Sequence, residues 1–205
     1  MLAKKIWFLF FFLSLLSFPW SSPAQKANFH ANPGVAIPKE KNILAAFESG
    51  FGFSLPFTKR IFLSINFAHW KSRVKEKEGA LMNGELSITP FFLSLQFKLR
   101  ERSQINPYLF LGANLVVIKF EIGEYITIPE VTLNQKVGNG PGLHFGIGTD
   151  FSFTENLTLF TEGIYLVRKA KAETTLTDLN FGVTTEEFSI SLDSLIFQIG
   201  IKYFF

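Results

Sequence analysis

Apolar and polar residues alternate with a period of two from residue 29 to the end of the chain, and clusters of turn-forming residues separate the alternating runs. Such alternation predicts β-strands that have one apolar face and one polar face. The first run contains Pro33, which lacks the amide donor that a strand interior normally uses. The predicted strands cover approximately residues 28–37, 43–55, 61–70, 86–100, 107–120, 143–153, 157–168 and 188–205.

The connections between these strands alternate in length. Short turns are predicted at 56–60, 101–106 and 154–156, and long connections at 71–84, 121–141 (with a strand-like piece at 125–128) and 171–187. This alternation is typical of membrane barrels, in which short periplasmic turns alternate with longer outer loops. Including the run at 28–37 gives the even strand number of bacterial single-chain barrels and leaves residues 38–42 as a short first outer loop. The predicted fold is an all-β, antiparallel, up-and-down transmembrane barrel of about eight strands.

The contents of the two faces indicate which one is buried. One face carries Phe, Leu, Ile and Val, and the other carries Gly, Ser, Asn, Gln and charged residues. The alternative, a soluble sandwich or barrel, would place the bulky face inside. The interior of an eight-stranded barrel is only wide enough for side chains to fill, so this many Phe and Leu residues would be hard to fit there. We therefore expect the apolar face to contact lipid and the polar residues to fill the interior.

The N-terminus has the features of a cleaved secretory signal peptide. Lys4 and Lys5 precede an apolar run, and Ser22 and Ala24 supply the small residues of a cleavage site after Ala24. This predicts a signal peptide over residues 1–24 and a barrel over 25–205. The alternative is a retained N-terminal anchor, although the apolar run is short for a spanning helix. Later segments lack the roughly 20 apolar residues that a transmembrane helix requires.

The end of the chain resembles the C-terminal signature of bacterial outer-membrane barrels, which has a terminal Phe, an aromatic residue two positions earlier and apolar residues at alternate positions upstream. The residues here are Ile199, Ile201, Tyr203 and Phe205. Segments 106–113 and 146–157 are similar to strand and hairpin motifs of the small OmpA/OmpX/OmpW size class. The resemblance implies an outer-membrane location after export through the inner membrane, a monomer, and contact with outer-membrane lipid, periplasmic chaperones and the barrel assembly machinery.

Charge and composition exclude several classes of function for this chain. Removal of Lys4 and Lys5 with the signal peptide leaves 18 basic and 17 acidic residues, so the chain offers no argument for nucleic-acid binding. The chain has no cysteine, which excludes disulfides and thiolate chemistry. His144 and Asp150 share the inward parity, but strand spacing separates them by roughly 20 Å, too far for acid–base coupling. The sequence therefore predicts no enzyme, no metal site and no cofactor.

Charged residues on the inward parity are the first candidate functional group. Narrow, low-dielectric interiors tolerate charges only when they are paired. The favoured interpretation is a structural ion network that blocks the interior, and the alternative is a gated ion path. The residues concerned are Glu48, Lys98, Arg100, Asp150, Glu162 and Lys202.

A second candidate is the cationic segment that follows Trp70. Lys71, Arg73, Lys75 and Lys77 lie near the predicted outer rim. A solvated loop is one interpretation, and contact with lipopolysaccharide phosphates is the other. For the whole protein we expect a non-enzymatic structural or surface-interaction role, with a channel for small solutes or hydrophobic molecules as the alternative.

Overall fold

The computed structural model describes residues 26–76, 81, 83–100, 104–123, 131–178 and 182–205. Eight strands form a closed antiparallel barrel in the order β1-β11-β8-β7-β5-β4-β3-β2, and β10, β9 and β6 form a separate three-stranded sheet. The barrel strands are β1 (Asn28–Pro38), β2 (Ala46–Pro56), β3 (Ile61–Val74), β4 (Gly84–Lys98), β5 (Ile105–Ile122), β7 (Gly140–Ser152), β8 (Leu157–Val167) and β11 (Ser194–Phe204). The predicted all-β, eight-stranded barrel is confirmed.

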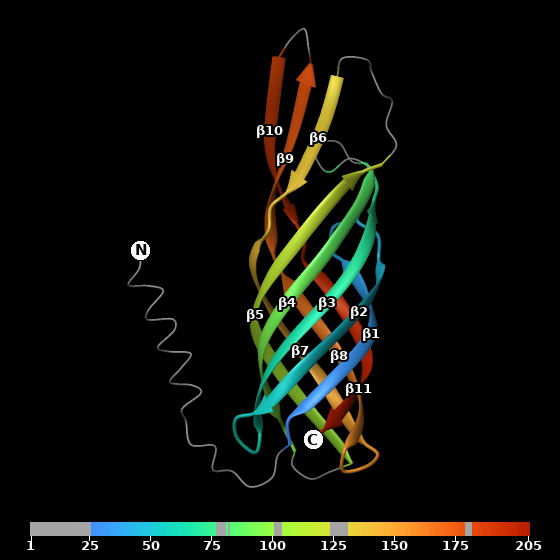
Figure 1. The fold of residues 1–205 in the computed structure, drawn as a ribbon, viewed down its shortest axis with the longest axis vertical. Coiled ribbons are helices and arrows are strands. Elements are labelled where there is room, and N and C mark those ends of the chain that lie inside the picture. The colour runs from blue at the N-terminus through green and yellow to red at the C-terminus, as the bar shows by residue number, and fades with distance from the viewer. Residues whose placement is uncertain (1–25, 77–80, 82, 101–103, 124–130, 179–181) are drawn as a thin grey trace, which may run out of the picture.

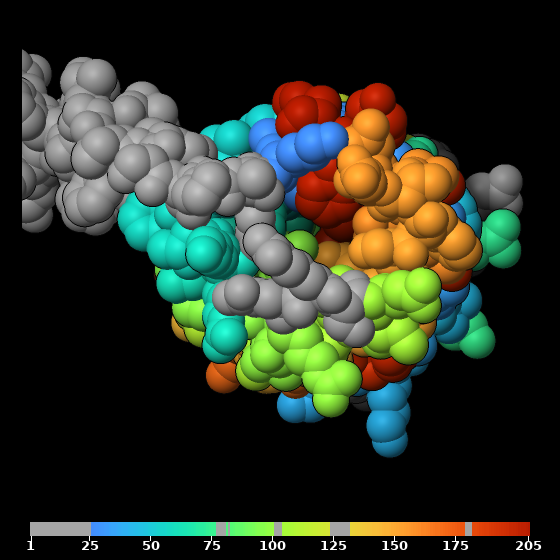
Figure 2. Space-filling model, turned by 90° about the horizontal axis from the view of Figure 1, so that it is seen from below, coloured from blue at the N-terminus to red at the C-terminus, as the bar shows by residue number. Residues whose placement is uncertain are grey.

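The first and last strands close the barrel. β1 pairs with β11 in the antiparallel sense, for example Phe29 with Tyr203, and the start of β1 and the end of β11 lie at the same end of the barrel (Figure 1). From below, the start of β1, the end of β11 and the turns after β2 and β7 surround that end (Figure 2). β1 forms despite Pro33 because its apolar positions still alternate outward while His30 and Asn32 are buried inside.

The outward positions form a continuous apolar wall. Phe47 is 70% exposed, Leu111 57% and Phe145 54%. Aromatic side chains also contact one another across this surface, with the Phe51 and Phe67 rings stacked at 5.2 Å. Exposed apolar surface this extensive is stable only against hydrocarbon. None of the described residues forms a helix that is long and apolar enough to cross a membrane.

Above the barrel, the predicted long loops are partly wrong. β3 continues to Val74, and residues assigned to loops form β6 (Val131–Val137), β9 (Lys169–Asp178) and β10 (Gly182–Ser191), which project as a sheet beyond the barrel (Figure 1). In β9 the inward residues Ala170 and Ala172 are buried while Lys169, Lys171 and Glu173 are exposed, so the alternation continues beyond the apolar band. The strand-like piece predicted at 125–128 and the signal peptide lie outside the described residues.

The prediction of a polar interior is wrong for the outer half of the barrel, the half nearest the projecting sheet. Apolar side chains are buried there. Ile43, which was expected on the outward face of β2, lies in a loop and is one of them. The buried apolar residues of this half are Ile43, Trp70, Val74, Leu81, Leu86, Ile88, Val116, Ile118, Leu166, Ile190 and Leu192. These residues share the inward parity of their strands or cover the barrel from its outer end. In segment 115–118 both faces are apolar, so alternation alone does not reveal the inward one.

Candidate functional site in the barrel interior

An ion cluster crosses the inner half of the barrel, the half nearest the start of β1 and the end of β11. Lys202 Nζ lies 2.8 Å from Asp150 Oδ1, Lys98 Nζ lies 3.7 Å from Asp150 Oδ2, and the Lys202 and Asp150 side chains are both 3% exposed. Lys202 also donates to Tyr108 Oη at 3.1 Å and lies 4.0 Å from Glu162 Oε1. The cluster therefore joins residues of β4, β5, β7, β8 and β11, which surround the interior.

Hydrogen bonds extend this cluster towards the opposite wall. Tyr108 Oη donates to Glu162 Oε1 at 2.6 Å, and Gln198 Nε2 donates to Glu162 Oε2. Asn32 Nδ2 then donates to Gln198 Oε1 at 2.8 Å and to Glu48 Oε1 at 3.3 Å. The structure thus brings together five of the six predicted inward charges. Arg100 differs, because β4 ends at Lys98 and the Arg100 side chain is exposed in the turn that follows.

Aromatic rings fill the space around the lysines. Lys202 Nζ lies 4.4 Å from the centre of the Tyr108 ring and 4.5 Å from that of Phe160, and Lys98 Nζ lies 4.4 Å from that of Phe62. Glycines on the neighbouring strands accommodate these rings: Gly148 pairs with Tyr108, and a Cβ at Gly148 would lie 2.4 Å from the Tyr108 ring. Paired charges and closely packed rings together form what we call the ion plug: Lys98, Tyr108, Asp150, Glu162, Gln198 and Lys202, with Asn32 and Glu48.

The ion plug should prevent steady ion flow. In planar-bilayer recordings, the wild-type chain is expected to show no sustained openings, because passage requires separating buried ion pairs. Glu162→Gln keeps the size of the side chain and one acceptor oxygen for Tyr108, so the interior stays filled and the variant should also remain silent. Sustained openings whose size changes with Glu162→Gln would contradict this and indicate a gated ion path.

A serine–histidine pair lies between the ion plug and the apolar outer half. Ser94 Oγ is 2.7 Å from His144 Nε2, and both residues are buried. Nucleophilic activation needs a third group to orient the histidine, but His144 Nδ1 has no hydrogen-bond partner among the described residues. No group of three or more His, Cys, Asp or Glu residues in the described part of the chain could hold a metal ion. The arrangement therefore positions His144 rather than activating Ser94.

Two prolines interrupt the hydrogen-bonded wall. Between β3 and β4 the pairing passes from Phe67–Phe91 to Trp70–Ile88 and omits the two positions around Pro90. A side-chain contact, His69 Nδ1 to Thr89 Oγ1 at 2.9 Å, spans this gap on the outward face. We call these two unpaired positions the β3–β4 gap. It lies where the interior changes character, since Trp70 and Ile88 belong to the apolar outer half.

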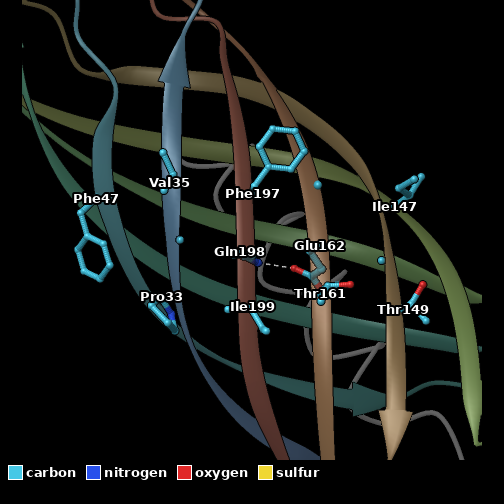
Figure 3. A pocket seen from close by; sticks show the side chains of 13 residues that line it. Pro33, Val35, Phe47, Ile147, Thr149, Thr161, Glu162, Phe197, Gln198 and Ile199 are labelled. Atoms are coloured by element: carbon cyan, nitrogen blue, oxygen red, sulfur yellow. Dashed lines mark hydrogen bonds between the residues drawn. The ribbon is translucent and has the colours of Figure 1, made fainter.

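The second interruption borders a groove in the outer wall. The β1–β11 pairing omits the positions around Pro33, passing from Ala31–Ile201 to Gly34–Gln198. A groove of about 640 Å³ crosses β2, β1, β11, β8 and β7 here (Figure 3). Its rim is apolar, and behind it Gln198 bonds to Glu162 of the ion plug. An apolar molecule in this groove would therefore meet the polar half of the interior rather than the apolar half.

The remaining predicted residues occupy two further regions. Ile199, Ile201 and Tyr203 lie on β11 and Phe205 follows it; these side chains are exposed on the outer wall. Lys71 and Arg73 lie on β3 rather than in a loop, Lys75 directly follows that strand, and Lys77 is outside the described residues. Lys71 Nζ pairs with Glu85 Oε1 at 2.8 Å.

The geometry defines the class of protein: a small membrane-spanning β-barrel with an interior filled by side chains and an apolar lipid-facing wall. The sequence profile described as the OmpW family matches residues 32–205. The chain belongs to the OmpW family. No match was found among curated protein sequences.

Solved structures share the fold at low sequence identity. OprG from Pseudomonas aeruginosa is 18% identical with a TM-score of 0.74, over 88% of this chain and 97% of that one. The outer membrane protein W of E. coli is 15% identical with a TM-score of 0.53, over 89% and 98%. AlkL, solved in DMPC bilayers, is 15% identical with a TM-score of 0.52, over 92% and 95%. At these identities the likeness concerns the fold alone.

Proposed function

We propose that the protein passes small apolar molecules from the cell surface into the outer membrane. These molecules would leave the barrel sideways, through the β3–β4 gap. The observation that carries this proposal is the position of that gap. It interrupts the strand pairing beside Trp70 and Ile88, where the apolar half of the interior meets the polar half.

The chemistry of the interior favours an apolar cargo. Most buried side chains of the outer half are apolar, although Asn42 and Ser72 are also buried there. Its apolar surface cannot replace the water around an ion or a sugar, whereas a hydrocarbon entering there loses no hydrogen bonds to solvent. Further descent would bring the molecule against Asp150, Glu162 and Lys202, whose charges would have to give up partners without compensation. The ion plug therefore directs an apolar molecule sideways rather than to the periplasm.

The β3–β4 gap offers the least costly exit from this region. Pro90 has no amide hydrogen, so part of the backbone pairing is already missing there. Separating the strands locally would break the His69–Thr89 contact, and a single hydrogen bond of this kind contributes only about 0.5–1.5 kcal/mol. The exit faces hydrocarbon, which is a favourable destination for the cargo.

A reversible crosslink across the gap tests the route. The chain has no cysteine, so His69→Cys with Thr89→Cys introduces one unique pair at facing outward positions. The protein is placed in vesicles, and an apolar fluorescent cargo is added outside them. Oxidation of the two cysteines should reduce transfer of the cargo into the membrane to the level seen with protein-free vesicles. Reduction of the disulfide should restore it.

A matched control uses the same two strands where their pairing is intact. Leu63→Cys with Leu95→Cys places the crosslink at another facing outward pair, and oxidation there should leave transfer unchanged. If the crosslink at the gap leaves transfer unchanged, or if both crosslinks block it equally, the lateral route is wrong.

A surface-interaction role is the second candidate, and the projecting sheet of β6, β9 and β10 favours it. Most β10 side chains are exposed, including Val183 at 67%. Deletion of residues 172–188, which removes most of β9 and β10, should abolish cell adhesion or partner contact if the sheet carries them, and should leave cargo transfer intact.

A further inference from the structure

A basic recess lies where the barrel wall continues into the projecting sheet. It has a volume of about 570 Å³ and is bounded by the end of β6, the start of β7 and the first residues of β9. The β7–β8 pairing ends at Leu143–Val167, and the β6–β9 pairing begins at Val137–Ala172. The second pairing does not continue the register of the first. The recess occupies the stretch between them.

Cations predominate around the recess. Lys136, Lys169 and Lys171 line it with exposed side chains, and Glu173 is the acidic residue in its lining. In the described part of the chain, none of these three ammonium groups forms an ion pair. This distinguishes them from Lys71 at the other side of the rim, which is paired with Glu85.

Arg168 forms part of the same lining but is buried, at 4% exposure. Its guanidinium donates to the carbonyl oxygens of Gly138 (2.7 Å), Val116 (3.3 Å) and Gly140. A guanidinium has five N–H groups, and here Nε has no partner among the described residues. The guanidinium is held by neutral carbonyls, and no carboxylate is bound to it in the described structure; the Asp193 carboxylate accepts from the Arg168 backbone amide instead. A buried cation in this situation is stabilised by a nearby anion.

The height of the recess identifies where that anion comes from. Outward positions of β8 run through Leu157 and Leu159 to Val167, and the next positions on the same parity are Lys169 and Lys171. β5 makes the same change, from Val117 to Lys119. The apolar band of a barrel faces hydrocarbon, so this change marks the level of the outer-leaflet headgroups.

We propose that the basic recess binds a phosphate group, as presented by the phosphorylated sugars of an outer-leaflet glycolipid. Lys169, Lys171 and Lys136 would contact the phosphate oxygens from the rim, and Arg168 would supply a fixed positive charge beneath them. Charge-assisted hydrogen bonds of this kind are the strong contacts that phosphates make with proteins.

The test compares two triple variants that remove the same charge at the same height. The recess variant is Lys136→Gln, Lys169→Gln, Lys171→Gln, and the rim control is Lys71→Gln, Arg73→Gln, Lys119→Gln. Binding of bis-phosphorylated lipid A to the folded full barrel in detergent is measured by native mass spectrometry, with dephosphorylated lipid A as a second probe and inorganic phosphate as a competitor. Heat-modifiable gel migration verifies that each variant is folded. We expect both variants to fold, because the substituted side chains are exposed.

The recess variant should bind bis-phosphorylated lipid A about tenfold more weakly or worse, since each basic residue at a charged surface contributes substantially to lipid binding. The rim control should bind as the wild type does. Weak binding of dephosphorylated lipid A, with little competition from millimolar phosphate, identifies the lipid as the source; full competition identifies free phosphate. Unchanged binding in the recess variant, or equal loss in both variants, overturns the proposal.

Discussion

Asp150→Leu is expected to destabilise the barrel by about 3–5 kcal/mol, because it leaves buried cations without their carboxylate. Asp150 holds Lys202 at 2.8 Å and Lys98 at 3.7 Å, and the Lys202 side chain is only 3% exposed and lies against the Tyr108 and Phe160 rings. The loss is measured as a change in the free energy of unfolding in urea, with the protein in lipid vesicles and tryptophan fluorescence as the signal.

Two further variants separate the burial of unpaired charge from a general loss of packing. Adding Lys202→Met to Asp150→Leu removes one of the stranded cations, so the double variant should recover part of the lost stability. Glu85→Gln breaks the exposed Lys71–Glu85 pair and should have no measurable effect. If the double variant is less stable than Asp150→Leu alone, the charge argument fails.

The second large effect is expected from Gly112→Ala. A Cβ at Gly112 would lie 2.0 Å from the carbonyl oxygen of Leu93 and 2.7 Å from the His144 ring. The carbonyl belongs to the paired β4 backbone and cannot move without distorting the wall, so we expect destabilisation of about 1–3 kcal/mol or more. Chemical unfolding in the same vesicles measures it.

Gly163→Ala is the matched control, because it adds the same methyl group to the outer surface. Its nearest neighbour would be the Phe197 ring at 3.7 Å, an ordinary contact distance. The expected change is below about 1 kcal/mol and could be stabilising, since alanine restricts the unfolded chain. Equal losses for the two variants would mean that strand propensity, rather than interior crowding, sets the role of Gly112.

The ion plug and the β3–β4 gap have separate consequences. Breaking the plug should lower stability before it opens a path, because its residues are held by packing as well as by charge. Closing the gap should alter transfer without altering stability, because the outward positions His69 and Thr89 do not contribute to the packed interior. Measuring both properties in both sets of variants therefore distinguishes the structural role of the interior from the proposed transport role.

The sequence by itself determined the strands of the barrel, their number and the direction of their apolar faces in the membrane. Alternation with a period of two and the short-long order of turns were sufficient, since neighbouring strands joined by short turns pair locally and lipid requires an apolar outer face. The same parity placed Glu48, Lys98, Asp150, Glu162 and Lys202 inside.

Only the tertiary structure decided which of these residues meet. Asp150 and Lys202 are far apart in sequence and come together across the interior because barrel closure and strand stagger set their relative heights. The same is true of the basic recess, whose cations come from two segments, 136 and 168–171, that gave no signal separately. The apolar outer half was hidden for two other reasons. In segment 115–118 both faces are apolar, so alternation disappears and only the closed barrel shows which face is inside. Near the outer ends of β3 and β4 alternation persists, but the apolar residues, such as Val74 and Leu86, change to the inward parity.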